Sequence, residues 1–582
     1  MPGLPPKSAI PLQPPFLYSP PVQTRQPKKK KSYSPIDSKE SMNPEPSLPL
    51  LLHLPLLLLF LLFTTTSSQN TSSTAETTTA NANISSCLLS SHVQNFTLYS
   101  SPPSIQYSNL LNFSIQNLCF AGPSIHKPSV LILPKTQHEL QSSILCCRSS
   151  SLAIRVRSGG HSYEGLSYTA GQHTPFAVID LMNLNRVWID SGSSTAWAES
   201  GATLGEIYYA VARSNRSLAF SAGSCSTVGS GGLISGGGFG FLSRKYGLAA
   251  DNVLDAVLID PAGRALDRKA MGEDVFWAIR GGGGGSWGAV YAWKLRLVPV
   301  PDPVTLCSIN RLGSVRQVAE LTHKWQYEAP NLPDEFYLST YIQASTNGNI
   351  TSLFSGLFLG PNGTAIRILR QRFPELAVSE SECSEMSWIE SAAQLANINS
   401  VSDLLNRKPR AKSYFKAKSD YVRAPIPMDG LITAIDLLSK QPKASVIFDP
   451  YGGEMGRIAS GDLPFPHRGG NLYGIQYMID WKKGEDGMAY VAWIRRLYGY
   501  MGRFVSKNPR AAYVNYVDLD LGTIEWTRGS GGSWDAVGVA RAWGEPYFLG
   551  NYDRLVRAKT EIDPDNVFRN EQSIPPLPKE GS

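Results

Sequence analysis

The stretch RVRSGGHSYEG, residues 155–165, decides the fold of this chain. It begins as a strand-like segment and runs directly into two adjacent glycines, Gly159 and Gly160. Glycine reaches positive φ without steric cost, so such a turn can bring backbone N–H groups against a phosphate. The order of strand and glycine pair therefore predicts a loop that binds a phosphorylated ligand.

Two further glycine-rich stretches follow, GSGGLISGGGFG at residues 229–240 and GGGGG at residues 281–285. Neither is a Rossmann fingerprint, which needs Gly-X-Gly-X-X-Gly opening a helix and an acidic residue about 20 positions later. A Walker loop is also absent from the sequence. Plain turns or flexible linkers are the alternative. Because each stretch borders apolar, strand-like sequence, we expect three loops that hold one large, flat, phosphorylated ligand by backbone contacts.

Outward from these loops, short apolar runs alternate with helical patterns, which is typical of an α+β or α/β domain. We expect strands at residues 130–133, 154–156, 177–181, 196–198, 257–259 and 289–295, and helices at residues 137–146, 204–214 and 274–279. The middle of the chain, residues 302–507, predicts a sheet with helices on one side. Its expected strands are residues 335–343, 350–359 and 472–481, and its expected helices are residues 315–327 and 428–440.

The motifs RSGGHSYEG (157–165) and GSCSTVG (223–229) resemble the two flavin-attachment motifs of the berberine bridge enzyme-like family. These are plant FAD-linked oxidases of the vanillyl-alcohol-oxidase-type FAD-binding superfamily. Further matching motifs occur in the same order, namely RKYGLAADN (244–252), MGED (271–274), NYVDLD (515–520) and DPDNVF (563–568). The resemblance covers about residues 87–577, nearly all of the chain that follows the N-terminal segments.

The resemblance implies an α+β fold with a two-part FAD-binding domain. Its N-terminal block would be residues 80–300, and its C-terminal segment, residues 508–577, would complete it. Residues 301–507 would form an inserted substrate-binding domain that contains an antiparallel sheet.

In the resembling family, a histidine nitrogen bonds the flavin 8α carbon and a cysteine sulfur bonds C6. His161 and Cys225 stand at these positions, so we expect FAD attached covalently at two points. Such bonds hold the ring in place and can raise its reduction potential. No metal is expected. The other residues expected to bind the cofactor are Arg157, Ser158, Gly159, Gly160, Ser162, Thr227, Val228, Gly229, Gly232, Gly236 and Gly237.

On the substrate side, oxidation of an alcohol needs a base for the hydroxyl proton. The resemblance gives this role to Tyr516, with Tyr163 and Gln476 at neighbouring substrate positions. A free phenol has a pKa of about 10, so Tyr516 needs a nearby cation or a shared proton. Many relatives have Lys at the position of Gly474, and the chain also departs from the family at Leu233 (His), Phe239 (Tyr) and Val517 (Arg). These departures bear on substrate class and turnover.

The implied reaction is hydride transfer to flavin N5, followed by reduction of O₂ to H₂O₂. Val228, the third residue after Cys225, stands where the family leaves room for oxygen. The expected partners are O₂ and a small-molecule or oligosaccharide donor. A reducing-end oligosaccharide is the first expectation, an aromatic allylic alcohol of the monolignol type the second, and an alkaloid the third. The rival is a flavin-bearing wall or allergen-like protein with negligible activity, which Gly474 and Leu233 favour.

The charge and the motifs exclude some partners and favour others. The formal net charge of +7 suits weak association with an acidic cell-wall polysaccharide. Zinc-finger spacing and RNA-binding aromatic motifs are absent, so no nucleic-acid partner is expected. A monomer is expected.

The N-terminal segments predict a secreted protein. Residues 1–47 are rich in Pro, Ser and Lys and are expected to be a disordered extension. Residues 48–68 predict a signal peptide, because the Leu-rich core is shorter than the roughly 18 apolar residues of a membrane span and small polar residues follow it. A signal anchor is the alternative. Because signal peptides begin near the N-terminus, Met42 rather than Met1 is the expected start. The expected destination is extracellular or the cell wall, with the vacuole as the alternative.

Glycosylation acceptors and cysteines fit a secretory route. Seven Asn-X-Ser/Thr triplets begin at Asn70, Asn83, Asn95, Asn112, Asn215, Asn349 and Asn362. The chain has seven cysteines, so at least one has no cysteine partner within the chain. Cys87 can pair with Cys146 or Cys147. A cysteine bound to flavin would account for the odd number.

Overall fold

The computed structural model describes residues 83–172, 174–345, 349–408, 412–526 and 535–579. The expected N-terminal extension, the signal peptide, the choice between Met1 and Met42, and Asn70 all lie outside these residues. In the described ranges, no helix is long and apolar enough to cross a membrane.

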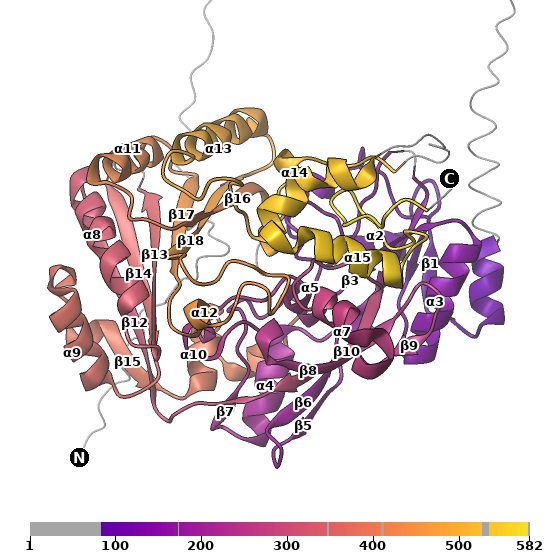
Figure 1. Ribbon diagram of the computed structural model, residues 1–582, viewed down its shortest axis with the longest axis horizontal. Coiled ribbons are helices and arrows are strands. Elements are labelled where there is room, and N and C mark those ends of the chain that lie inside the picture. Colours follow the sequence, from indigo (N-terminus) through magenta and orange to yellow (C-terminus); the bar gives the residue numbers. More distant parts are fainter. Residues whose placement is uncertain (1–82, 173, 346–348, 409–411, 527–534, 580–582) are drawn as a thin grey trace, which may run out of the picture. The chain divides into compact units, whose positions relative to one another are not determined.

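The first glycine loop follows a small sheet with the order β1-β2-β4-β3 (Figure 1). Strands β2 (Val130–Ile132), β4 (Phe176–Asp180) and β3 (Ala153–Arg157) are parallel, and β1 (Phe96–Leu98) pairs antiparallel with β2. Helix α3 (Gln137–Ser149) connects β2 to β3 and begins at Thr136, whose side chain accepts a hydrogen bond from the Glu139 N–H. This N-cap satisfies one of the N–H groups that a helix start leaves open. The loop therefore leaves the carboxyl end of a buried strand.

A second sheet, antiparallel, carries the rest of the N-terminal block in the order β5-β6-β10-β8-β9. Its strands are β5 (Val187–Asp190), β6 (Thr195–Glu199), β10 (Ala289–Arg296), β8 (Val253–Ile259) and β9 (Ala265–Leu266). Helices α4 (Leu204–Ser214) and α7 (Arg268–Ile279) belong to the same block. The strands and helices expected between residues 130 and 295 are confirmed, whereas β5, with its alternating half-buried pattern, was not expected.

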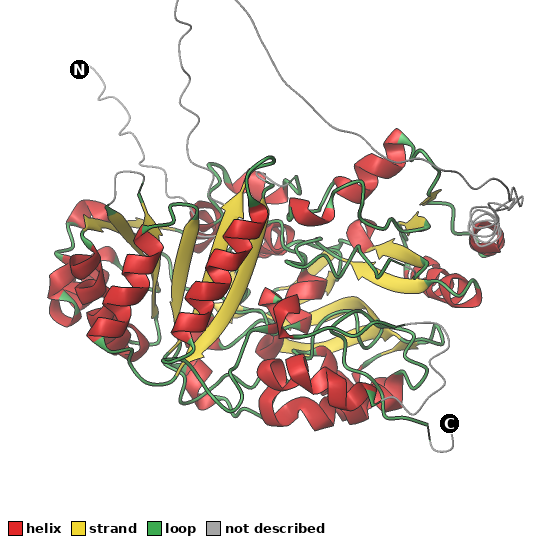
Figure 2. Ribbon diagram, turned by 90° about the horizontal axis from the view of Figure 1, so that it is seen from above, coloured by secondary structure: helices red, strands yellow, loops and turns green. Residues whose placement is uncertain are grey.

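The sheet of the middle segment has seven antiparallel strands in the order β15-β12-β14-β13-β17-β18-β16. They are β15 (Cys383–Met386), β12 (Val304–Gly313), β14 (Ile350–Phe358), β13 (Phe336–Ala344), β17 (Ala444–Pro450), β18 (Tyr473–Trp481) and β16 (Tyr414–Val422). Helices α8 (Val315–Glu328), α9 (Asn362–Arg372), α11 (Met428–Ser439) and α13 (Gly487–Met501) cover one face (Figures 1 and 2). The predicted sheet with helices on one side is confirmed.

The C-terminal segment returns to the N-terminal block. Helices α14 (Ala536–Phe548) and α15 (Tyr552–Ile562) share one apolar core with α4, α7 and β10. The fully buried Lys559 donates to the carbonyl oxygens of Ser286 at 2.6 Å and Phe568 at 2.7 Å, and it pairs with Asp563 at 2.6 Å. The α+β fold and the joining of the N-terminal block to the C-terminal segment are thereby confirmed, while the boundaries 80–300, 301–507 and 508–577 stay predictions.

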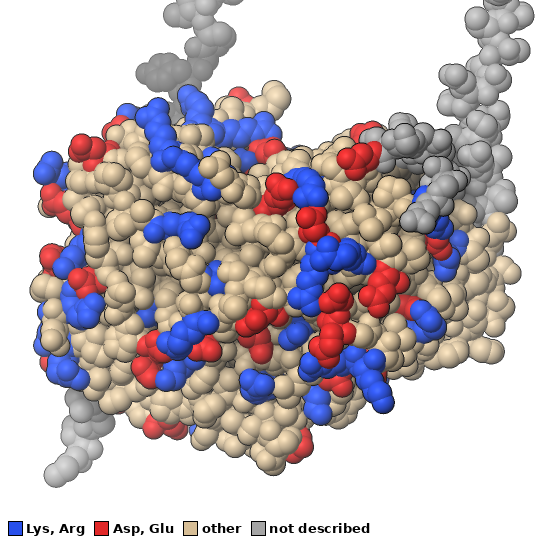
Figure 3. Space-filling view, viewed as in Figure 1, with Lys and Arg blue, Asp and Glu red and all other residues tan. Residues whose placement is uncertain are grey.

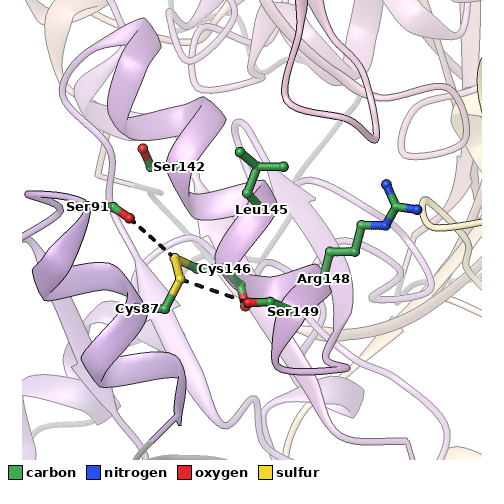
Figure 4. A pocket seen from close by; sticks show the side chains of 7 residues that line it. All are labelled: Cys87, Ser91, Ser142, Leu145, Cys146, Arg148 and Ser149. Carbon is green, nitrogen blue, oxygen red and sulfur yellow. Dashed lines mark hydrogen bonds between the residues drawn. A yellow bond between two sulfur atoms is a disulfide. The ribbon is translucent and has the colours of Figure 1, made fainter.

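Two disulfides lie in the described residues. Cys87 pairs with Cys146, which settles the choice left open by the sequence, and Cys147 is buried in the neighbouring core. The Ser91 and Ser149 hydroxyls contact this disulfide at the edge of a shallow surface hollow (Figure 4). The second disulfide, Cys307–Cys383, joins β12 to the edge strand β15 and was not expected. Cys225 lies outside both disulfides.

The fold predicts that Lys559 stabilises the junction of the two parts. Lys559→Met leaves the carboxylate of Asp563 buried without its cation, so we expect the free energy of unfolding to fall by about 3–5 kcal/mol. Lys440→Met removes an ion pair on the exposed surface of α11 and should cost at most about 1 kcal/mol. Urea unfolding followed by tryptophan fluorescence measures both variants, and equal losses would contradict a special role for Lys559.

Candidate active site

Two glycine loops interlock through their backbones. A Cβ atom placed on Gly159 would lie 2.2 Å from the Gly229 nitrogen, and one on Gly229 would lie 2.0 Å from the Ser158 Oγ. Neither distance is sterically allowed, so this crossing requires glycine on both sides. Ser158 anchors the crossing by donating a hydrogen bond of 2.6 Å to the Ser200 carbonyl oxygen. The segments that carry His161 and Cys225 are thereby fixed against each other.

The two expected tether residues meet at one hydroxyl group. The His161 Nε2 lies 2.9 Å from the Thr227 Oγ1, and the Cys225 Sγ lies 3.7 Å from the same oxygen. Burial lowers the pKa of His161 to about 4, although a hydrogen bond at Thr227 opposes this shift. The imidazole is therefore neutral at neutral pH and keeps a lone pair for bonding. Because Thr227 engages Nε2, Nδ1 is the nitrogen left to bond a flavin carbon.

The second and third glycine-rich stretches leave open space beside their backbones. A Cβ atom on the exposed Gly232 would meet no atom within 4 Å. A Cβ atom on Gly284, which is also exposed, would approach nothing closer than the Ser235 Cβ at 3.7 Å, and the Gly232 Cα lies 3.9 Å from it. Accessible backbone of the two stretches thus meets at Gly232 and Gly284. Such an opening lined by backbone fits a phosphorylated ligand such as the expected FAD.

Gly236 and Gly237 continue the second stretch towards the C-terminal segment. A Cβ atom on Gly236 would lie 2.0 Å from the Asn515 Oδ1, and Gly237 has a φ of +106°. Asn515 donates a hydrogen bond of 2.9 Å to the Leu233 carbonyl oxygen. These glycines therefore permit the NYVDLD motif to approach the flavin-side loop closely.

The remaining expected cofactor residues have partners within the protein. All three guanidinium nitrogens of the buried Arg157 are engaged, by Asp180 and by the carbonyl oxygens of Leu110 and Leu111. This geometry indicates that Arg157 supports the glycine loop from the protein interior. Gly160 has a φ of +70°, the Ser162 Oγ accepts a hydrogen bond from the Leu166 N–H, and Val228 is half-buried. Their roles toward FAD stay predictions. Across the described ranges, no group of three His, Cys, Asp or Glu side chains could hold a metal ion.

The structure brings the three expected substrate-side residues together. The rings of Tyr163 and Tyr516 are stacked, with centroids 5.5 Å apart and planes inclined by 2°. Gln476, on β18, donates a hydrogen bond of 2.7 Å from Nε2 to the Tyr163 hydroxyl. Burial raises the pKa of Tyr163, and burial followed by the neighbouring Tyr163 and Asp449 raises the pKa of Tyr516. Both side chains are therefore neutral phenols at neutral pH.

A group of charges, four of them buried and Asp520 at the exposed edge, holds these tyrosines in place, and we term it the lysine–carboxylate clasp. It consists of Glu164, Lys416, Lys418, Asp518 and Asp520. Lys416 pairs with Asp518 at 2.7 Å and with Glu164, and Lys418 pairs with Asp520 at 2.8 Å. Glu164 follows Tyr163 directly, and Asp518 comes two residues after Tyr516. The clasp thus ties both tyrosines to β16.

Sequence reasoning missed the clasp and also a carboxylate outside it, Asp449. The alternation of Lys416, Lys418 and Asp420 along residues 414–422 is the signal that could have shown charges on one side of a strand. Asp449 lies on β17, directly opposite Gly474 of β18, and accepts a hydrogen bond from the Tyr337 hydroxyl. Burial raises the pKa of Asp449 to about 6.

Comparison with known proteins agrees with this geometry. Residues 128–268 match the family model for an FAD binding domain, and residues 512–575 match the model described as berberine and berberine like. The chain is 55% identical to berberine bridge enzyme-like D-2 of Nicotiana tabacum over 516 residues, which cover 85% of this chain and 91% of the relative.

Solved structures show the same similarity. Berberine bridge enzyme from Eschscholzia californica is 48% identical with a TM-score of 0.82, over 85% of this chain and 99% of that one. Phl p 4, a grass pollen allergen with glucose dehydrogenase activity, is 41% identical with a TM-score of 0.80, over 85% of this chain and 100% of that one.

The clasp predicts a stability that depends on acid. Burial alone would raise the pKa of Asp520, but hydrogen bonds from Arg495 and Lys418 hold it below the usual range. A lowered pKa stabilises the folded state above the unfolded-state value of about 3.9, and this contribution is lost as the pH falls through the folded-state value. We expect Asp520→Asn to reduce the free energy of unfolding by about 1.5–3 kcal/mol at pH 7.

The difference between wild type and Asp520→Asn should shrink as the pH falls below about 4, where aspartate begins to protonate in the unfolded chain. Urea unfolding at a series of pH values measures it. Asp436→Asn, which removes an exposed partner of Lys440, is the control and should have little effect at any pH. A pH-independent loss in Asp520→Asn would show that its charge is not what stabilises the fold.

Proposed function

Because the chain belongs to the berberine bridge enzyme-like family and is an FAD-dependent oxidoreductase, we propose that it oxidises its donor with FAD bound covalently through His161 and Cys225. The convergence of both side chains on Thr227 carries this proposal. When bound, FAD supplies an acceptor for two electrons as a hydride. A neutral His161 offers Nδ1 to the flavin 8α carbon, and Cys225 offers its sulfur to C6.

The substrate-side residues hold the donor and its proton. Gln476 fixes the Tyr163 hydroxyl, and the ring of Tyr516 stacks on the ring of Tyr163. A base must be deprotonated to take the donor's proton. Since burial and the neighbouring oxygens raise the pKa of Tyr516, its phenolate fraction increases only in the alkaline range, and turnover should rise with pH there.

We propose O₂ as the electron acceptor, with H₂O₂ as the product. The support is Val228, three residues after Cys225. Its half-buried side chain packs against the apolar core that α14 and α15 share with α4, α7 and β10. A larger side chain in a tightly packed site would fill a space the size of O₂.

For the donor, a CH–OH group of a reducing-end oligosaccharide remains the first candidate. One similar solved structure is described as having glucose dehydrogenase activity, which supports it. Lys and Arg side chains gather over α11 and α13 on the face seen in Figure 3, a location suited to an acidic polysaccharide. An aromatic allylic alcohol, an alkaloid amine and negligible activity are the alternatives. Release of H₂O₂ with cellodextrins, oligogalacturonides, coniferyl alcohol and tetrahydroprotoberberines distinguishes all four.

Secretion as a monomer belongs to the same proposal. Its support is the signal-peptide pattern at residues 48–68 and the acceptor asparagines. Among the described acceptors, Asn83, Asn112 and Asn349 are exposed, whereas the half-buried Asn362 donates its amide to the Cys383 carbonyl oxygen. Glycans are therefore expected first at the three exposed positions.

The double attachment predicts that flavin stays with the protein after acid precipitation. His161→Ala and Cys225→Ala should each retain flavin through the remaining bond, and the double variant should release all of it. Absorbance of the pellet and the supernatant near 450 nm measures retention. Free FAD released from the wild type would refute covalent attachment.

The role of Tyr516 predicts a slow chemical step when its hydroxyl is removed. We expect Tyr516→Phe to lower the rate of flavin reduction about 10²- to 10⁴-fold, as for loss of a general base. Anaerobic stopped-flow measurement with an active donor gives this rate, and donor binding should change little. Tyr163→Phe is the matched variant, since it removes the neighbouring hydroxyl of the same stacked pair. An unchanged rate in Tyr516→Phe would assign the proton to another group.

A further inference from the structure

Asp449 is a carboxylate without a cation partner among the described residues. The Tyr337 hydroxyl donates to its Oδ1, and within the described ranges no hydrogen bond reaches Oδ2 and no Lys, Arg or His forms an ion pair with it. The residue is half-buried. Placing a carboxylate in such a position costs free energy unless a positive group compensates it.

The neighbouring strand does not supply that positive group. Gly474 stands directly opposite Asp449 in the register of β17 and β18. A Cβ atom on Gly474 would meet only the rings of Tyr421 and Tyr451, at 3.6–3.9 Å. Arg244, a buried cation that reaches the residue after β17, spends its donors on the carbonyl oxygens of Pro330, Leu332, Phe336 and Tyr451.

Asp449 faces the substrate side of the sheet. Val446 and Phe448 of β17 point into the core beneath the helices, so alternation places Asp449 on the opposite face, together with Gln476. Gln476 bonds Tyr163 on this face, and its own Oε1 is buried without a hydrogen-bond partner. Burial and then Tyr163 are the largest causes of the raised pKa of Tyr516, and the charge of Asp449 raises this pKa further.

A cluster of aromatic rings adjoins Tyr337, the side chain that contacts the same carboxylate. The rings of Phe239 and Tyr451 are stacked at 5.2 Å, and the ring of Tyr337 lies 6.1 Å from Phe239 and 4.6 Å from Phe241. Aromatic faces attract organic cations through their quadrupole. A carboxylate, a buried amide oxygen and several rings on one face are the elements that bind a protonated amine.

We propose that Asp449 determines substrate specificity by binding a protonated amine on the donor, so that the site selects cationic donors over neutral donors of the same shape. The inference rests on the proposed function, because it takes the Tyr163–Tyr516–Gln476 face to be the donor site. The amine can belong to an aromatic amine or to an amino sugar. The ring cluster favours the aromatic amine, so among the donors of the proposed function this inference places an alkaloid-type amine ahead of a neutral oligosaccharide.

The test compares matched ligands on the flavin-loaded protein at pH 7.5 under anaerobic conditions. Tyramine and tyrosol differ in an ammonium against a hydroxyl group, and glucosamine and glucose form the corresponding sugar pair. Isothermal titration calorimetry gives each Kd without turnover. A hydrogen bond to a charged group corresponds to a preference of about 10- to 100-fold, which we expect for at least one amine over its neutral partner.

Asp449→Asn keeps the shape and removes the charge, so the preference should fall to about onefold while the Kd of the neutral ligand stays unchanged. Asp480→Asn is the control. Asp480 is also half-buried and on the same face of β18, but it lies near Lys443, six residues from Gly474. This variant should keep the wild-type preference.

Two results would overturn the proposal: a wild type that prefers neither amine, or a preference that survives in Asp449→Asn. Acid precipitation of the same preparations reports covalent flavin separately. Loss of covalent flavin with a retained, Asp449-dependent preference would reject the proposed attachment and leave the specificity inference standing. Intact covalent flavin without any amine preference would reject the specificity inference and leave the proposed attachment standing.

Discussion

The lysine–carboxylate clasp is the interaction on which the substrate side of the site depends. It brings together three segments that are distant in sequence, namely the loop after β3, strand β16 and the C-terminal NYVDLD motif. Two lysines and three carboxylates share it, so each buried charge has at least one partner of opposite sign. Among the described residues, the clasp supplies the ion pairs that join the segments of Tyr163 and Tyr516. The rings of Tyr163 and Tyr516 lie parallel in this arrangement.

The flavin side depends on a constraint of a different kind, the backbone crossing of Gly159 and Gly229. No charge takes part in it, and its specificity comes from the absence of side chains. Thr227 then sets the positions of the His161 imidazole and the Cys225 sulfur around a single oxygen. Electrostatics thus organise the substrate side, and steric exclusion organises the cofactor side.

Much of this arrangement follows from local sequence, and the parts that do not are long-range. Residues 204–214 form a helix as expected, because Thr203 and Glu206 provide a capping box and the apolar residues recur with helical period. Strand β16 escaped prediction because Lys416, Lys418 and Asp420 mask its strand pattern, and their partners lie about a hundred residues or more away. The tethers were identifiable because their motifs are contiguous. The lack of a cation partner for Asp449 among the described residues was not identifiable, because it depends on the absence of a charged side chain at Gly474 on the neighbouring strand.

The division between the two sides has an evolutionary consequence. Both tether residues and all three glycine-rich stretches lie in the N-terminal block, whereas Asp449, Gly474 and Gln476 lie on one face of a separate sheet. A duplicated gene could therefore exchange side chains on β17 and β18 without disturbing the residues proposed to hold the flavin. New donor specificities would arise through substitutions on one face of this sheet, while the inherited redox chemistry stayed unchanged.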